Sequence, residues 1–232
     1  MIHRLALVPF VLTALAVASA SLHATTYTLE PNHTQGVVRW DHLGFSNPTA
    51  QFSHVEGTLE FDPANVAASS VRVTIPIANL GTGVSDLDDD FHAKEFFDIA
   101  NFPTAAFKST KVEKGAMAGQ LKVSGDLTLR GVTKPVVLDA TLNKIGINPR
   151  NHLPSIGFAA TTSLKRSDFG LGRFVPQVGD AIEIQITAEG AEAKGYAELQ
   201  KKETEEEARE AKAAAAKAAT ATSPPPGAPA KN

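Results

Sequence analysis

The acidic run that begins at Asp86 is the first place in this chain where residue type and spacing could do chemistry. Asp86, Asp88 and Asp90 stand at the first, third and fifth positions of a calcium-binding loop. The sixth position of such a loop requires Gly and the twelfth a bidentate Glu, but Phe91 and Phe97 stand there. The run does not match a calcium loop. Acids just before a short helix ordinarily stabilise its N-terminal amides.

The remaining side chains with catalytic or ligating potential form no recognisable constellation. Five of the seven histidines follow residue 24, and they are scattered without an HxH or HxxxH pair: His33, His42, His54, His92 and His152. Cysteine is absent, which excludes thiol nucleophiles, thiolate metal sites and disulfides. The sequence GVSDL at residues 83–87 lacks the second glycine of a nucleophile elbow. The sequence therefore predicts no catalytic residue, no metal site, no cofactor and no enzyme.

Charge excludes one further class of partner. The chain of 232 residues carries 22 Lys and Arg against 25 Asp and Glu, a formal net charge of −3. Removal of an N-terminal segment that contains Arg4 would leave −4. Because a phosphate backbone requires a basic surface, we expect no nucleic-acid partner.

Composition divides the chain into four parts. In residues 1–24, Arg4 is followed by a short apolar run and then by small residues, which indicates a cleaved secretory signal peptide. Residues 25–194 suffice for one domain. Residues 195–219 are rich in Ala, Glu and Lys with Glu205 and Arg209 at i,i+4 spacing, which predicts a solvated helix that acts as a spacer. Residues 220–232 contain a Pro-rich stretch and are expected to be disordered.

Period-two alternation of apolar and polar residues predicts the elements of the domain. Residues 121–129 place Leu121, Val123, Leu127 and Leu129 on one face, and residues 182–187 repeat the pattern with isoleucines. About eight or nine such segments are joined by short turns without long amphipathic helices. We expect an all-β fold, an antiparallel up-and-down barrel of about eight strands, with a sandwich as the alternative.

The one interruption of this pattern is rich in phenylalanine. Residues 91–98 predict a short helix that carries Phe91, Phe96 and Phe97, and Phe102 follows it. Such a helix must pack its rings against a barrel end or a barrel lining. The pattern leaves both open, and a plain core plug is the simpler interpretation.

Several motifs together resemble a known family. They are Tyr27-Thr28-Leu29-Glu30-Pro31 with His33, Asp41-His42-Leu43-Gly44-Phe45-Ser46, Phe61-Asp62-Pro63, Glu95-Phe96-Phe97-Asp98, Phe102-Pro103-Thr104-Ala105, residues 125–136 (GDLTLRGVTKPV), Arg166-Ser167-Asp168-Phe169-Gly170 and Val178-Gly179-Asp180. In order and spacing the chain resembles the YceI-like family, the polyisoprenoid-binding periplasmic proteins of lipocalin-like fold.

The resemblance implies a barrel whose apolar tunnel holds a long isoprenoid lipid, such as a polyprenyl phosphate or a quinone, as ligand and not as cofactor. The eight phenylalanines that we expect to line or close the tunnel are Phe45, Phe52, Phe91, Phe96, Phe97, Phe102, Phe158 and Phe169. Many family members have a His and then an Arg leading into the helix, where this chain has Asp90 and His92. The acidic run favours a neutral head group unless His42, Lys94 or Arg166 supplies positive charge.

Two other functions stay open at this point. An enzyme that hydrolyses a lipid head group could use Asp88 or Asp90 with His92. A stress-protective structural module could act through its C-terminal tail. The partners that we expect are an isoprenoid lipid, with transient membrane contact and a homodimer as further expectations.

Overall fold

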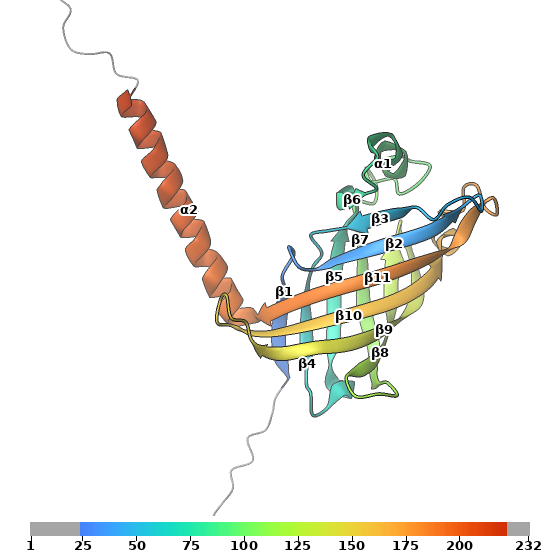
Figure 1. Ribbon diagram of the computed structural model, residues 1–232, viewed down its shortest axis with the longest axis horizontal. Coiled ribbons are helices and arrows are strands. Elements are labelled where there is room, and N and C mark those ends of the chain that lie inside the picture. The colour runs from blue at the N-terminus through green and yellow to red at the C-terminus, as the bar shows by residue number, and fades with distance from the viewer. Residues whose placement is uncertain (1–23, 222–232) are drawn as a thin grey trace, which may run out of the picture.

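The computed structural model describes residues 24–221, and in it a single antiparallel sheet closes into a barrel (Figure 1). Eight strands form the closed barrel, in the spatial order β1 (Thr25–Leu29), β4 (Glu56–Phe61), β5 (Ser70–Pro76), β7 (Thr104–Lys114), β8 (Gln120–Leu129), β9 (Val132–Ile147), β10 (Pro154–Lys165) and β11 (Val178–Glu192), which pairs with β1. The predicted all-β antiparallel barrel is confirmed.

Three more strands extend the sheet beyond β11. They are β2 (Gln35–His42), β3 (Thr49–Phe52) and β6 (Leu80–Gly81). Both β1 and β2 pair with β11, β1 near its C-terminal end (Leu29 opposite Gly190) and β2 toward its N-terminal end (His42 opposite Val178). The short 3₁₀ helix η2 (Ile77–Asn79) connects β5, a strand of the closed barrel, to β6, the last strand of the extension.

The barrel interior is built from the apolar positions that alternate along each strand. A bulge between Ser109 and Lys111 shifts the register of β7, so that Phe107 and Val112, five residues apart, are both buried. Gly125 stands on the facing strand β8, where a Cβ atom would overlap the ring of Phe107. The glycine therefore allows a phenylalanine ring to lie against the strand.

The two ends of the barrel are built differently. At the end where β11 passes into α2 (Ala193–Ala221), which we name the closed end, the 3₁₀ helix η1 (Val66–Ala68) buries Val66 against a large core cluster with Tyr27, Phe61 and Phe107. At the opposite end, which we name the mouth end, lie α1 (Ser85–His92) and η3 (Arg166–Phe169). A smaller cluster around Val38 and Trp40 packs there.

The short helix lies earlier in the chain than the sequence predicts. It spans Ser85–His92 and not residues 91–98, with Asp86 and Asp88 in its first turn, where their charges favour the helix dipole. Residues 93–98 form turns, and Asp98 has a φ of 51°. On a regular helix, at about 100° per residue, Phe96 and Phe97 would point about 140° and 240° away from Phe91. The turns instead allow the three rings to contact one another.

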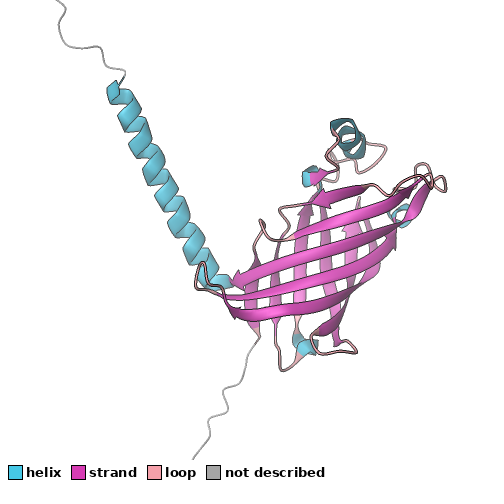
Figure 2. Cartoon of the chain, in the orientation of Figure 1, coloured by secondary structure: helices cyan, strands magenta, loops and turns pink. Residues whose placement is uncertain are grey.

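The predicted charged extension is the helix α2, which projects away from the closed end of the barrel (Figure 2). Its side chains are mostly exposed, and Lys201 pairs with Glu205 at 3.9 Å. Arg209 pairs with Glu206 at 3.6 Å and not with Glu205 as expected. The predicted signal peptide and most of the predicted disordered tail lie outside the described residues. Within residues 24–221, no helix is both long and apolar enough to cross a membrane.

Candidate functional site

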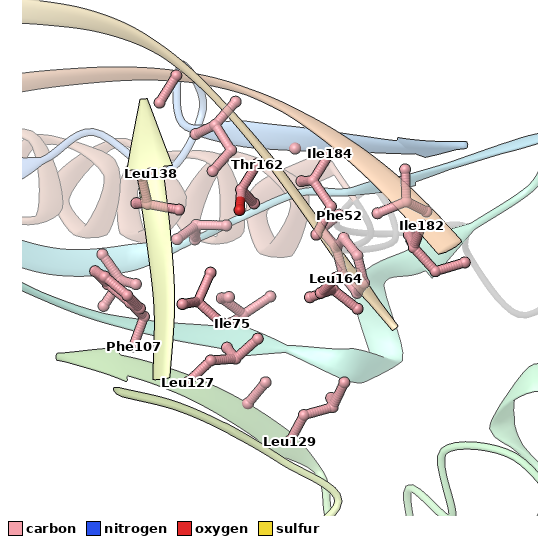
Figure 3. Close-up of a pocket in the computed structure, with 18 of the residues that line it drawn as sticks. Phe52, Ile75, Phe107, Leu127, Leu129, Leu138, Thr162, Leu164, Ile182 and Ile184 are labelled. Atoms are coloured by element: carbon pink, nitrogen blue, oxygen red, sulfur yellow. The ribbon is translucent and has the colours of Figure 1, made fainter. Parts of the chain in front are cut away.

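A cavity of about 520 Å³ runs through the interior of the barrel. Figure 3 shows apolar side chains from several strands pointing into it, among them Leu127 of β8, Leu138 of β9, Leu164 of β10 and Ile184 of β11. Its volume falls within the range of about 300 to 1,000 Å³ that is typical of small-molecule sites. Small side chains on the inner face, such as Ala140 and Ala160, leave this space unfilled.

Polar groups are few along the middle of the cavity. Thr162 contributes the oxygen atom seen in Figure 3, and its hydroxyl group donates a hydrogen bond to the backbone carbonyl of Val137 at 2.8 Å. Because that donor is already satisfied within the protein, the hydroxyl group does not require a polar ligand. The middle of the cavity therefore fits a hydrocarbon chain.

The exposure of the lining residues shows where the cavity opens. Toward the closed end, the lining residues Leu29, Thr34 and Ser69 are all buried. At the mouth end, the lining residue Phe174 is 54% exposed, and Arg173 beside it is also exposed. The cavity therefore opens to solvent at the mouth end.

Aromatic rings gather at this opening. Phe91 of α1 lies 5.6 Å from Trp40, 5.5 Å from Phe96 and 6.1 Å from Phe97, measured between ring centroids. Phe96 in turn lies 6.4 Å from Phe174. These distances are those of favourable tilted and edge-to-face pairs. The five rings form a cluster that a flat or unsaturated group could enter.

Two arginines stand at the mouth and differ in their contacts. The guanidinium group of Arg173 lies over the rings of Phe174 and Phe96, 4.8 and 5.8 Å from their centroids. Arg166 donates hydrogen bonds to four backbone carbonyls, those of Leu171, Arg173, Val178 and Gly179. Burial lowers the pKa of Arg166, and the charge of Asp180 opposes that shift. Arg166 thus holds the loop between η3 and β11 in place, which leaves little of its hydrogen-bonding capacity for a ligand.

The acids of α1 differ in their surroundings, and among residues 24–221 they belong to no group of three side chains placed to hold a metal ion. Asp88 accepts hydrogen bonds from the backbone amide and the hydroxyl group of Thr82, both at 2.7 Å, and these bonds lower its pKa. Asp88 therefore anchors the start of α1 to the preceding turn. Asp90 is exposed and lines the cavity, so it places a negative charge at the mouth.

The structure brings together seven of the eleven ligand-binding residues predicted from the sequence. Those in the cavity lining are His42, Phe52, Phe91, Phe96, Phe97, Phe158 and Arg166. The other four, Phe45, Lys94, Phe102 and Phe169, lie outside it.

The four residues outside the lining have other surroundings. Phe45 is 90% exposed in the loop between β2 and β3, whereas Phe169 of η3 is only 1% exposed. The ring of Phe102 lies against Gly131, at a distance that leaves no room for a side chain there. Lys94 is exposed, and its backbone carbonyl accepts a hydrogen bond from Arg130 at 2.9 Å.

The sequence did not single out most of the residues that form the cavity. These are the aliphatic side chains of the inner strand faces, together with Trp40, Phe61, Phe107, Arg173 and Phe174. Period-two alternation identifies the inward positions of each strand, and that signal was present. It does not distinguish a cavity wall from a packed core, because both are apolar.

Comparison with known proteins shows which family this architecture matches. The profile of the YceI-like domain matches residues 27–190. A UPF0312 protein of Vibrio cholerae is 35% identical over 173 residues, which cover 73% of this chain and 89% of the relative. The crystal structure of a Campylobacter jejuni YceI protein is similar at a TM-score of 0.59, with 29% identity, and the match covers 66% of this chain and 89% of that one.

One structural neighbour is distant in sequence. A domain from Saccharophagus degradans described as polyisoprenoid-binding has a TM-score of 0.57 and 13% identity to this chain. The match covers 72% of this chain and 99% of that domain. At this identity the likeness concerns the fold.

Proposed function

Because this chain belongs to the YceI-like family, we propose that it binds and carries a long isoprenoid lipid in the barrel cavity without converting it chemically. The observation that carries the proposal is the apolar cavity, which is closed at one end and open at the other. The description of the Saccharophagus degradans domain as polyisoprenoid-binding supports the same ligand class.

The free energy of transferring an isoprenoid chain into the cavity depends on whether the chain leaves water or a bilayer. Each five-carbon isoprene unit gains about 4 kcal/mol on leaving water, at about 0.8 kcal/mol per buried CH₂ group. On leaving a bilayer the unit gains almost nothing, because lipid tails are as apolar as the cavity. Affinity for a membrane lipid must therefore come from the fit of the chain and from contacts to its head group at the mouth.

The proposed head group is neutral, such as a quinone ring. Asp90 places a negative charge in the lining, and the acids of α1 add to it. A pyrophosphate would be repelled by these charges, and Arg166 has four carbonyl partners of its own. Among the described lining residues, the guanidinium group of Arg173 is the one arginine charge left at the opening, and it lies over the rings of Phe96 and Phe174. The cluster of Trp40, Phe91 and Phe96 provides rings against which a flat head group can stack.

Trp40 allows a direct test, because it is the single tryptophan of the chain and lines the cavity. Titration of lipid-free protein with a short-chain ubiquinone should quench its fluorescence saturably at one ligand per chain. Farnesyl pyrophosphate should bind more weakly. A linear, non-saturating response to both ligands would refute lipid binding in the cavity, and tighter binding of the pyrophosphate would refute the neutral head group.

The lipid carried in the cell can be identified separately. Organic extraction of the protein purified from its own host, followed by mass spectrometry, should recover an intact isoprenoid lipid. A hydrolysed product in place of the intact lipid would support an enzyme instead. N-terminal sequencing of the same material should show cleavage near Ala20 or Ala24, as the proposed periplasmic location requires.

We further propose that the mouth end contacts a bilayer transiently. The loops of residues 43–48 and 170–177 flank the paired residues His42 and Val178 and reach the right-hand end of the barrel in Figure 1. They carry Phe45, 90% exposed, and Phe174, 54% exposed, and Arg173 is the one charged residue in their sequences. A largely apolar tip with one cationic residue beside a cavity opening suits insertion among lipid head groups.

Flotation with phosphatidylcholine vesicles tests this contact. The variant Phe45→Ser should lower vesicle binding by at least about tenfold, because burial of a phenylalanine side chain contributes about 1.5–3 kcal/mol. Met117→Ser is the matched control, since Met117 is 67% exposed in the turn between β7 and β8 at the closed end. Equal loss of binding in both variants would contradict an insertion site at the mouth.

A further inference from the structure

A second cluster of ligating side chains lies at the closed end, outside the cavity. Glu30 follows β1, His33 lies in the turn between β1 and β2, and Glu189 belongs to β11. One ligand atom from each residue, an imidazole nitrogen and two carboxylate oxygens, lies within 4.8 Å of the others. Among residues 24–221 this is the one such cluster of three.

The backbone holds these three residues together. The amide of Glu30 donates to the carbonyl of Glu189 at 2.9 Å, and the hydroxyl group of Thr34 donates to the same carbonyl at 3.2 Å. The amide of His33 donates to the carbonyl of Glu30 at 3.0 Å and so closes the turn. The geometry of the cluster therefore rests on main-chain contacts of a strand pair and not on flexible side chains alone.

Glu30 is a buried carboxylate whose hydrogen bonding is incomplete within the described part of the chain. It is 9% exposed, and its Oε2 lies 3.0 Å from Nδ1 of His33. Its other oxygen, Oε1, is buried and has no hydrogen-bond partner in the described part of the chain. An unpartnered buried carboxylate oxygen is costly. Glu189 adds a second carboxylate to the cluster, so two carboxylates lie beside one imidazole.

We propose that Glu30, His33 and Glu189 bind one divalent transition-metal ion, of which Zn²⁺ is the most suitable probe. An imidazole ligand favours such an ion over Mg²⁺ or Ca²⁺, which prefer oxygen ligands alone. A cation would partner Oε1 and offset both carboxylates at once. His33 and Glu189 are exposed, so water can complete the coordination and the ion can enter from solvent.

The ion would join the turn between β1 and β2 to β11. Leu29 and Thr34, on either side of the cluster, line the cavity from within. A bound ion would thus stiffen the wall at the closed end. This role does not depend on which lipid the cavity binds, so the proposal stands apart from the proposed function.

Calorimetric titration of the full, tag-free chain with ZnCl₂ after chelator treatment tests the site. We expect one Zn²⁺ per chain, and a Co²⁺ absorption spectrum characteristic of mixed nitrogen and oxygen ligands. The variants His33→Asn and Glu189→Gln should each weaken Zn²⁺ binding by about 100-fold or more, because even the loss of a residue that only orients a ligand costs about 10–100-fold.

Matched controls are His54→Asn and Glu183→Gln, which make the same changes outside the cluster, and they should bind Zn²⁺ like the parent protein. Circular dichroism at matched temperature should show that all four variants fold. Absence of stoichiometric Zn²⁺ binding by the folded parent protein would overturn the proposal. So would equal weakening in the cluster variants and in the controls, because that result would place the ion elsewhere on the surface.

Discussion

Phenylalanine rings are buried at the closed end of this barrel and partly exposed at the mouth end. At the closed end, Phe61 is 3% and Phe107 6% exposed, and both belong to a cluster of ten buried residues. At the mouth end, the buried cluster has four members, and Phe91 and Phe97 are only partly buried beside it. A barrel that served stability alone would pack both ends. The difference indicates that the closed end supplies most of the stability, whereas the mouth end leaves rings exposed at the opening of the proposed binding cavity.

Truncation of one ring at each end should separate these roles. Phe61→Ala should lower the free energy of unfolding by about 3–5 kcal/mol, because the ring is buried and packs edge-on against Phe158 at 5.7 Å. Phe97→Ala, at a partly exposed site, should cost less than half as much but weaken ubiquinone binding. Urea unfolding and Trp40 fluorescence measure the two effects. Equal destabilisation by both variants would remove the distinction between the ends.

The mouth nevertheless depends on one structural residue. Arg166→Lys should cost about 2–3 kcal/mol in urea unfolding, because lysine cannot replace a guanidinium group that reaches four carbonyls. Arg39→Lys is the matched control, since Arg39 makes only an exposed pair with Glu183 at 3.3 Å, and its cost should stay below about 0.5 kcal/mol. Similar values for both variants would show that the loop does not need Arg166.

A third pair of variants tests whether the space between the two ends is the binding site. Ala160→Phe on the inner face of β10 should fill part of the cavity and weaken ubiquinone binding by at least about tenfold, which is about 1.4 kcal/mol. Ala159→Phe adds the same ring to the exposed face of the same strand and should leave the affinity unchanged. If both bind ubiquinone like the parent protein, the lipid does not occupy the cavity.

Much of the fold follows from period-two alternation, and its failures have physical causes. Long strands such as β8 and β11 repeat the pattern often enough to predict an eight-stranded barrel. The strands β3 and β6 have four and two residues, too few to show alternation. The helix α1 was placed six residues too late because the phenylalanines were taken as its packing face. Its first turn contains Asp86 and Asp88, whose charges favour the N-terminal end of a helix.

The sequence predicted the aromatic character of the candidate site but not most of the residues that form it. Aromatic residues drew attention to Phe91, Phe96 and Phe97, which do line the cavity. No sequence pattern identified Arg173 as a site residue, because its role depends on the two rings that it covers in the folded protein. The contact between the turn at His33 and Glu189 joins positions about 155 residues apart, as the bond from Thr34 shows. The spacing of residues along the sequence does not predict such a contact.

The smallest expected effect is a pH dependence at the mouth. Burial alone would raise the pKa of Asp180, but hydrogen bonds from Ser167 and the charges of Arg166 and Lys165 outweigh it, so that the pKa is lowered. A carboxyl group with a lowered pKa stabilises the fold above its ordinary value, about 3.9, and loses that contribution as pH falls through the lowered pKa.

Asp180→Asn should therefore cost about 1 kcal/mol at pH 7, where the carboxylate accepts bonds of 2.8 and 2.9 Å from Ser167. In urea unfolding from pH 7 to pH 3, the difference between Asp180→Asn and the parent protein should shrink as the carboxyl group becomes protonated. Asp126→Asn, on the exposed face of β8, should show no comparable difference at either pH. A difference for Asp180→Asn that stays constant down to pH 3 would mean that packing, and not the charge of Asp180, supports the loop at the mouth.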